Sequence, residues 1–174
     1  MTLIYRPATP EDALSISVLA MQVFLDTYAL NGMRTDLARE ALGLYQADDL
    51  RTNIALGTSP HQFIVAERDG YLLGFTALEH GAVAPQPELS IGLKCNKLYV
   101  QRHFKRLGIG QQLLRHAELV AAQSQASCVW LTAWIHNTAA ITFYEAMGYA
   151  DVGRTLYYFE GIGHENIVFS KSLN

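Results

Sequence analysis

A short turn between a strand and a helix, at residues 98–110, constrains the fold of this chain more than any other segment. An apolar strand ends at Val100, a loop with two glycines follows, and an amphipathic helix begins near Gly110. Consecutive unpaired N–H groups at a helix N-terminus carry a partial positive charge and can hold a phosphate. Glycine lets the backbone approach a diphosphate closely, because no Cβ intervenes. The segment therefore predicts an α/β chain with an anion-binding turn.

The turn is basic, although the chain carries a formal net charge of −3. Its cations are Arg102, Lys105 and Arg106. An ordinary tight turn with a solvated basic loop is the alternative interpretation. Two other phosphate motifs are excluded, because no Gly-Lys-Ser/Thr follows as in a P-loop and Leu113 occupies the third glycine position of a dinucleotide fingerprint.

The length of 174 residues fits one domain, expected to cover residues 1–174. A hydrophobic fraction of 50% and a charged fraction of 17% predict a sizeable core and exclude a mainly disordered chain. The acidic balance argues against nucleic acid as a partner, and no apolar run reaches the roughly 18 residues that span a membrane. The two cysteines, Cys95 and Cys128, lack the spacing of a zinc site. We therefore expect reduced thiols, no metal, and a cytoplasmic protein without a signal peptide.

Hydrophobic periodicity predicts the element order β-α-α-β-β-β-α-β-α-β-β. Strands are expected at residues 2–6, 63–66, 71–75, 89–100, 128–135, 149–160 and 164–172. Helices are expected from residue 9 onward and at residues 35–56, 110–123 and 138–147, with a break near Ala47 in the second. The apolar positions expected to face the core in the first helix are Leu14, Val18, Met21 and Leu25. The order predicts a mixed sheet with helices on both faces.

A second informative segment runs from Asn137 to Tyr149. Asn137 fits a helix N-cap and Gly148 a helix stop. Tyr144 follows Ala140 and Ile141 at helical spacing, which fits a core aromatic with its hydroxyl at the rim.

Together, the loop K-R-L-G-I-G and the later segment N-x-x-A-x-x-F-Y-E-x-x-G-Y resemble the GNAT superfamily of acetyl-CoA-dependent N-acetyltransferases. The resemblance implies a GNAT fold, with a central mixed, mostly antiparallel twisted sheet of about seven strands, helices on both faces, and a splay at the fourth and fifth strands. The C-terminal half is most similar to the spermidine/spermine-type N-acetyltransferases, through the stretches 97–100, 129–131, 143–149 and 167–173.

The resemblance also implies roles for single residues. The catalytic pair would be Leu98, whose N–H stabilises the oxyanion, and Tyr144, which protonates the departing CoA thiolate. One well-aimed oxyanion donor contributes about 2.7 to 4 kcal/mol. The residues implied to bind acetyl-CoA are Leu98, Tyr99, Val100, Lys105, Arg106, Leu107, Gly108, Ile109, Gly110, Gln111, Asn137 and Tyr144.

The acceptor implied by the resemblance is a primary amine of a small, polyamine-like molecule. It would bind around Asp26, Tyr28 and His164, with Tyr157, Tyr158 and Glu165 nearby. Acids and tyrosines suit a cationic amine through charge pairing and cation–π contact. The alternative is a polar surface without a substrate role.

The sequence leaves the identity of the general base open. Many GNAT enzymes carry a carboxylate at the position of Lys94, and a lysine does not readily deprotonate an ammonium group. A water chain could instead end at Glu79, Glu88, His80 or His136, or no base is needed.

Other functions stay open as well: a peptide N-terminal or lysine acetyltransferase, a non-catalytic acyl-CoA-binding regulator, and a structural domain. Dimers are common in the family, so a homodimer is one expected assembly.

Overall fold

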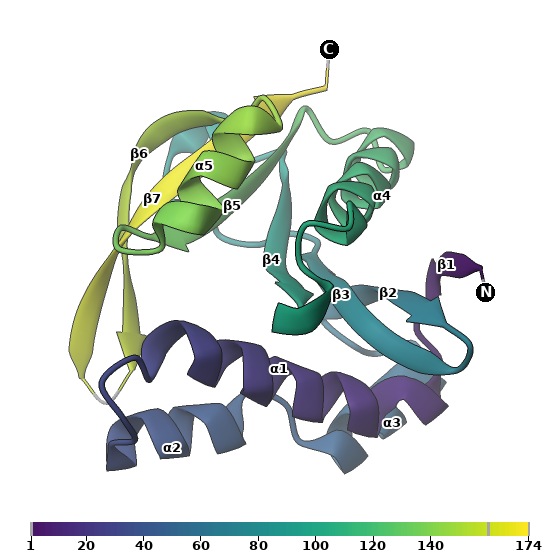
Figure 1. Cartoon of the computed structure of the whole chain (residues 1–174). Coiled ribbons are helices and arrows are strands. Elements are labelled where there is room, and N and C mark those ends of the chain that lie inside the picture. The colour runs from purple at the N-terminus through teal and green to yellow at the C-terminus, as the bar shows by residue number, and fades with distance from the viewer. Residues whose placement is uncertain (1, 160, 174) are drawn as a thin grey trace. The chain divides into compact units, whose positions relative to one another are not determined.

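The structure is a computed structural model that describes residues 2–159 and 161–173 (Figure 1). Within that part of the chain, the strands are β1 (Leu3–Pro7), β2 (His61–Arg68), β3 (Tyr71–Glu79), β4 (Leu93–Val100), β5 (Cys128–Trp134), β6 (Ala150–Phe159) and β7 (Ile162–Ser172). The helices are α1 (Ala13–Tyr28), α2 (Thr35–Gly43), α3 (Ala47–Leu56), α4 (Ile109–Gln123) and α5 (Thr138–Ala146). Single 3₁₀ turns occupy Pro10–Asp12, Pro87–Leu89 and Arg102–Phe104.

The strands form one seven-stranded sheet in the order β1-β2-β3-β4-β5-β7-β6. The pair β4–β5 is parallel, whereas β1–β2, β5–β7 and β6–β7 are antiparallel. The predicted mixed, mostly antiparallel sheet is therefore confirmed. Among the described residues, no helix is both long and apolar enough to cross a membrane.

The turn between β2 and β3 shows how local sequence sets the fold. Asp69 and Gly70 both have positive φ, of 53° and 83°. A two-residue turn of this kind matches the right-handed twist of a hairpin, and Asp-Gly is one of its preferred sequences. The strands expected at residues 63–66 and 71–75 therefore form a β-hairpin through this turn.

Two predicted details were wrong. The strand expected at 89–100 begins at Leu93, because the 3₁₀ turn at Pro87–Leu89 comes first and the Gly92 N–H donates to the Leu89 carbonyl at 2.8 Å. The face of α1 expected to pack was also wrong, since Leu14 and Val18 are 58% and 55% exposed. The buried side chains of α1 are instead Ala13, Ile16, Ser17, Leu19, Ala20, Val23 and Phe24.

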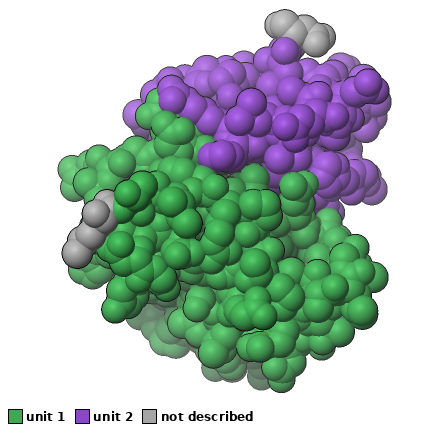
Figure 2. Space-filling view, turned by 90° about the vertical axis from the view of Figure 1, so that its right-hand side faces the viewer, with its two compact units in different colours: residues 1–77, 97–114 green, residues 78–96, 115–174 purple. Residues whose placement is uncertain are grey.

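The chain divides into two compact units, which Figure 2 colours separately. Unit 1 comprises residues 1–77 and 97–114, and unit 2 comprises residues 78–96 and 115–174. The elements β3, β4 and α4 contribute residues to both units.

In unit 1, α1 packs against α2 and α3 (Figure 1). An aromatic chain runs through its core, with ring centroids 5.5 Å apart for Tyr45 and Phe63, 6.0 Å for Phe63 and Phe75, and 5.6 Å for Phe75 and Tyr99. This chain fixes the C-terminal end of β4 against β3 and β2. The position of Tyr99 is thus set by core packing.

In unit 2, α5 packs on the sheet through Tyr144, whose ring centroid lies 5.8 Å from that of Phe169 in β7. The Glu118 carboxylate in α4 accepts hydrogen bonds from the Tyr149 hydroxyl at 3.2 Å and from Lys171 Nζ at 2.9 Å. Burial and the neighbouring Glu118 charge raise the pKa of Tyr149. This cluster ties α4 to the start of β6 and the end of β7.

Candidate active site

The turn after β4 has the backbone geometry of an anion site. Arg106 and Gly108 both adopt left-handed conformations, with φ of 64° and 79°. The first hydrogen bond of α4 runs from the Gln112 N–H to the Gly108 carbonyl at 3.1 Å. The amides that precede Gln112 in the first turn of α4 have no intrahelical acceptor. Left-handed residues next to a helix start direct successive N–H groups to one side and form a concavity for anions.

The side chains around this turn fit the same ligand class. Lys105, Arg106 and Leu107 are exposed, whereas Ile109 is buried and anchors the start of α4. The Arg68 guanidinium lies 5.5 Å from the centre of the Phe104 ring and fixes the 3₁₀ turn that precedes the loop. A Cβ on Gly108 would meet no atom within 4 Å, so glycine is needed there for its φ. The turn combines exposed amides with two exposed cations, which fits a diphosphate.

The end of β4 is held by β3. The Gln101 N–H donates to the Leu73 carbonyl at 3.0 Å, and Thr76 Oγ1 donates to the Lys97 carbonyl at 2.9 Å. A Cβ on Gly74 would lie 2.6 Å from the Tyr99 carbonyl oxygen. The backbones of β3 and β4 therefore meet more closely at Gly74 than any side chain would allow.

The ladder between β4 and β5 is short. Its register comprises Leu93↔Val129 and Lys94↔Trp130, whereas β5 pairs with β7 from Cys128 to Trp134. Both pairs lie in unit 2, and the splay of the fourth and fifth strands stays a prediction.

Helix α5 carries the other two predicted cofactor residues, Asn137 and Tyr144. Asn137 is the N-cap, and its side chain accepts a hydrogen bond from the Ala140 N–H at 3.2 Å. Tyr144 is only 9% exposed, and its ring lies near Phe143 and Tyr149, with centroids 5.3 and 6.2 Å away. The capping role of Asn137 is therefore confirmed, and its role in cofactor binding stays a prediction.

The predicted acceptor residues fall into two groups. In unit 1, Asp26 is exposed and Tyr28 is half-buried, with its ring 4.7 Å from that of Phe24. Burial, and secondly the charge of Glu40 in α2, raise the pKa of Tyr28 to about 12, so its hydroxyl stays protonated near neutral pH. Glu40 was not predicted, because only the packing of α2 on α1 brings it near Tyr28. In unit 2, the His164 ring stacks on Phe159 with centroids 4.1 Å apart.

Lys94, the residue found where a base was expected, forms an ion pair. Its Nζ lies 3.1 Å from Glu79 Oε2 and 5.4 Å from the centre of the Trp130 ring. Glu79 is thus the partner of Lys94. The other candidate bases, Glu88, His80 and His136, are exposed.

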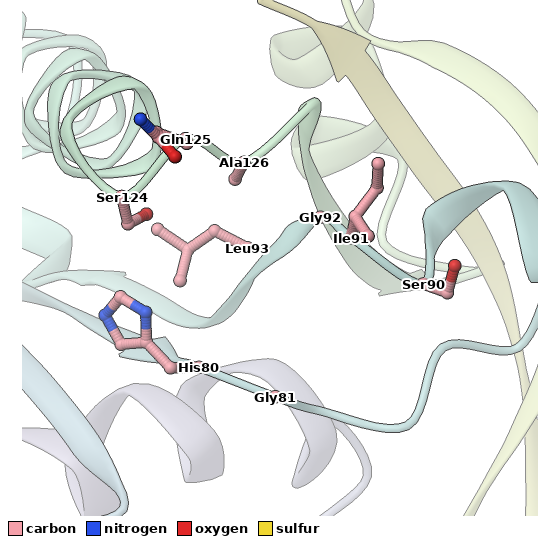
Figure 3. A pocket seen from close by; sticks show the side chains of 9 residues that line it. All are labelled: His80, Gly81, Ser90, Ile91, Gly92, Leu93, Ser124, Gln125 and Ala126. Atoms are coloured by element: carbon pink, nitrogen blue, oxygen red, sulfur yellow. The ribbon is translucent and has the colours of Figure 1, made fainter.

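A cavity of about 330 Å³ lies elsewhere in unit 2 (Figure 3). It is lined by His80, Gly81, Ser90, Ile91, Gly92, Leu93, Ser124, Gln125 and Ala126. Three of its lining residues, Ser124, Gln125 and Ala126, come directly after the C-terminal end of α4. The glycine turn lies before the N-terminus of the same helix. None of the residues predicted to bind acetyl-CoA lines it. Among residues 2–159 and 161–173, no group of three or more His, Cys, Asp or Glu side chains could hold a metal ion.

Known proteins share both the sequence pattern and the fold. An uncharacterized N-acetyltransferase from the pepI 3′ region of Lactobacillus delbrueckii subsp. lactis is 27% identical over 130 residues, which are 75% of this chain and 74% of that protein. The PaiA N-acetyltransferase of Thermoplasma acidophilum, solved in complex with coenzyme A, superposes with a TM-score of 0.74 at 20% identity and covers 99% of both chains. YncA of Salmonella typhimurium, solved with acetyl-CoA, gives a TM-score of 0.72 at 17% identity over 100% of this chain and 95% of that chain.

At these identities the two solved structures show a shared fold, and the family assignment rests on the sequence profile. The profile of the acetyltransferase (GNAT) domain matches residues 59–151, just over half of the chain. The matched range contains the turn after β4 and all of α5. This match shows that the chain belongs to the GNAT family of acetyltransferases.

Proposed function

We propose that this chain transfers the acetyl group of acetyl-CoA to a primary amine of a small, polyamine-like molecule, by direct attack within a ternary complex. The observation that carries the proposal is the turn after β4, where left-handed Arg106 and Gly108 precede the free amides of α4. The family match and the CoA complexes of proteins with this fold support acetyl-CoA as the donor. Cys95 and Cys128 are both buried thiols, which supports a reducing, cytoplasmic setting.

The turn and the end of β4 hold the donor in this proposal. The amides from Lys105 to Gly110 bind the diphosphate, with Gln111 in the same helical turn, and Lys105 and Arg106 add positive charge. The backbone of Leu98, Tyr99 and Val100 binds the pantetheine arm. The Leu98 N–H donates to the thioester carbonyl oxygen, where negative charge develops as the amine attacks.

The transfer forms one bond and breaks another. The amine nitrogen attacks the thioester carbon, the C–N bond forms, and the C–S bond breaks with its electron pair left on sulfur. Tyr144 donates its hydroxyl proton to that sulfur and regains a proton from the amine or from solvent. A phenol near pKa 10 can protonate a departing thiolate whose thiol has a pKa of about 8.5.

Several features of the predicted acceptor residues support a cationic amine. The Tyr28 ring and the carboxylates of Asp26 and Glu40 all belong to unit 1, and the Glu40 charge acts on Tyr28. Carboxylates and aromatic faces both attract an ammonium group. His164, stacked on Phe159, supplies a further polar aromatic surface in unit 2.

An acceptor panel tests the proposal. Thiol release from acetyl-CoA should rise with spermidine, spermine or putrescine, and mass spectrometry should find the acetylated amine. The same assay should stay at background with peptides that offer a free N-terminus or a lysine side chain. Turnover on peptides but not on polyamines would contradict the small-molecule acceptor and indicate a peptide or protein acceptor. Acetyl-CoA binding without turnover on either panel would indicate a non-catalytic acyl-CoA-binding regulator.

A further inference from the structure

Thr76 places a buried hydroxyl against the segment of β4 that is predicted to bind the thioester. Its side chain belongs to β3 and is 0% exposed. Thr76 Oγ1 donates to the backbone carbonyl of Lys97 at 2.9 Å. A buried hydroxyl is costly without a hydrogen bond, so this contact fixes both the side chain and the carbonyl.

The carbonyl of Lys97 and the N–H of Leu98 belong to the same peptide group. A trans peptide is planar and resists twisting, so its C=O and N–H point in opposite directions as one rigid unit. A bond that fixes the carbonyl therefore also fixes the direction of the N–H. A hydrogen bond to the carbonyl also polarises the peptide and makes its N–H a stronger donor.

We propose that Thr76 is a positioning residue for acetyl transfer, because its hydroxyl aims and polarises the Lys97–Leu98 peptide whose N–H faces the thioester oxygen. The inference rests on the proposed function, and specifically on the oxyanion role of Leu98. Thr76 itself does not touch the substrate.

The neighbouring contacts explain why a side chain is needed at this point. The register between β4 and β5 ends at Lys94. Beyond it, β4 is held from the side of β3, through Gln101 and Leu73, through the close approach at Gly74, and through Thr76. Of these, the Thr76 bond acts directly on the peptide that carries the Leu98 N–H.

The test compares three variants by the infrared carbonyl stretch of bound acetyl-CoA, labelled with ¹³C at the thioester carbon. Thr76→Val keeps the shape of the side chain and removes the donor, whereas Thr76→Ser keeps the donor. Thr52→Val is the matched control, because Thr52 Oγ1 also donates to a carbonyl, that of Asp48 at 2.9 Å, on exposed α3. This readout needs no acceptor amine.

The stretch should be lower in the wild-type complex than in free solution, as polarisation by the Leu98 N–H requires. Thr76→Ser and Thr52→Val should keep that shift, and Thr76→Val should lose most of it. In the acceptor assay, Thr76→Val should lower kcat about tenfold, less than the 10²–10³ lost with a whole donor, and leave the KM for acetyl-CoA within about twofold.

An unchanged stretch and kcat in Thr76→Val, with only a lower melting temperature, would make Thr76 structural and overturn the proposal. Absence of a shift in the wild-type complex would overturn it too, and the acceptor panel would then decide the function separately. If Thr76→Val does not fold, Thr76→Cys takes its place, because a thiol has similar size and is only a weak donor. The same two results then support or overturn the proposal.

Discussion

A Tyr144→Phe variant should lose at least about 100-fold in kcat, because general acid catalysis contributes about 10²- to 10⁴-fold. The substitution removes the proton that the thiolate needs and retains the ring. The contacts of that ring with Phe143, Tyr149 and Phe169 should therefore survive. Stopped assays of thiol release at saturating acetyl-CoA, together with calorimetric binding of acetyl-CoA, measure the two quantities separately. We expect a large loss of turnover with almost unchanged affinity.

The matched control is Tyr149→Phe. Tyr149 is also buried in unit 2, and its hydroxyl donates to Glu118 at 3.2 Å. Loss of that bond should lower the free energy of unfolding by about 1 kcal/mol. Turnover should remain near the wild-type value. If Tyr144→Phe retained full turnover, the acid would be another group, and the assignment of Tyr144 would be wrong.

A Gly74→Ala variant should damage donor binding and turnover together. The added Cβ would lie 2.6 Å from the Tyr99 carbonyl oxygen and 3.2 Å from Val100 Cα, both of which are backbone atoms. Because neither atom can rotate away, β4 must shift where the pantetheine arm is predicted to bind. Overpacking of this kind costs about 1 to 3 kcal/mol of stability. A misplacement near 1 Å can cost about 100-fold in rate, so kcat/KM for acetyl-CoA should fall by about that factor.

Gly43→Ala is the control for this substitution. Gly43 ends α2, and a Cβ there would meet no atom within 4 Å. Its kinetics should match the wild type, and its melting temperature should be equal or slightly higher, because alanine is favoured over glycine in a helix. Wild-type kcat/KM in Gly74→Ala would mean that β4 tolerates the shift, or that Leu98–Val100 do not contact the donor.

Local sequence signals predicted the elements well where a short segment sets its own geometry. Three features are each set by a few adjacent residues. They are the Asp69–Gly70 turn, the end of α3 at Gly57 with φ of 64°, and the left-handed Gly108 before α4. The turn after β4 and the cap at Asn137 belong to this class. Both could be read from the chain before any tertiary contact was known.

Tertiary packing determines several features that local sequence patterns do not predict. Helix α1 carries apolar side chains on two faces, so hydrophobic periodicity alone does not predict which face packs against the core. The buried face is the one that contains Ile16 and Val23. Leu89 looks like a strand residue but is buried in a 3₁₀ turn. The approach of Glu40 to Tyr28 and the bond from Thr76 to Lys97 arise from packing between separate helices and strands. No local sequence pattern predicts these two contacts.

The binding of acetyl-CoA is the central claim, and the melting temperature of the wild-type protein with and without this ligand tests it most directly. A ligand at about one hundred times its Kd should stabilise the fold by about 2.7 kcal/mol, which raises the melting temperature of a domain of this size by several degrees. We predict such a rise with acetyl-CoA and with CoA, and none with acetate. No rise at millimolar acetyl-CoA would contradict the account, because the turn after β4 would then have no role in ligand binding.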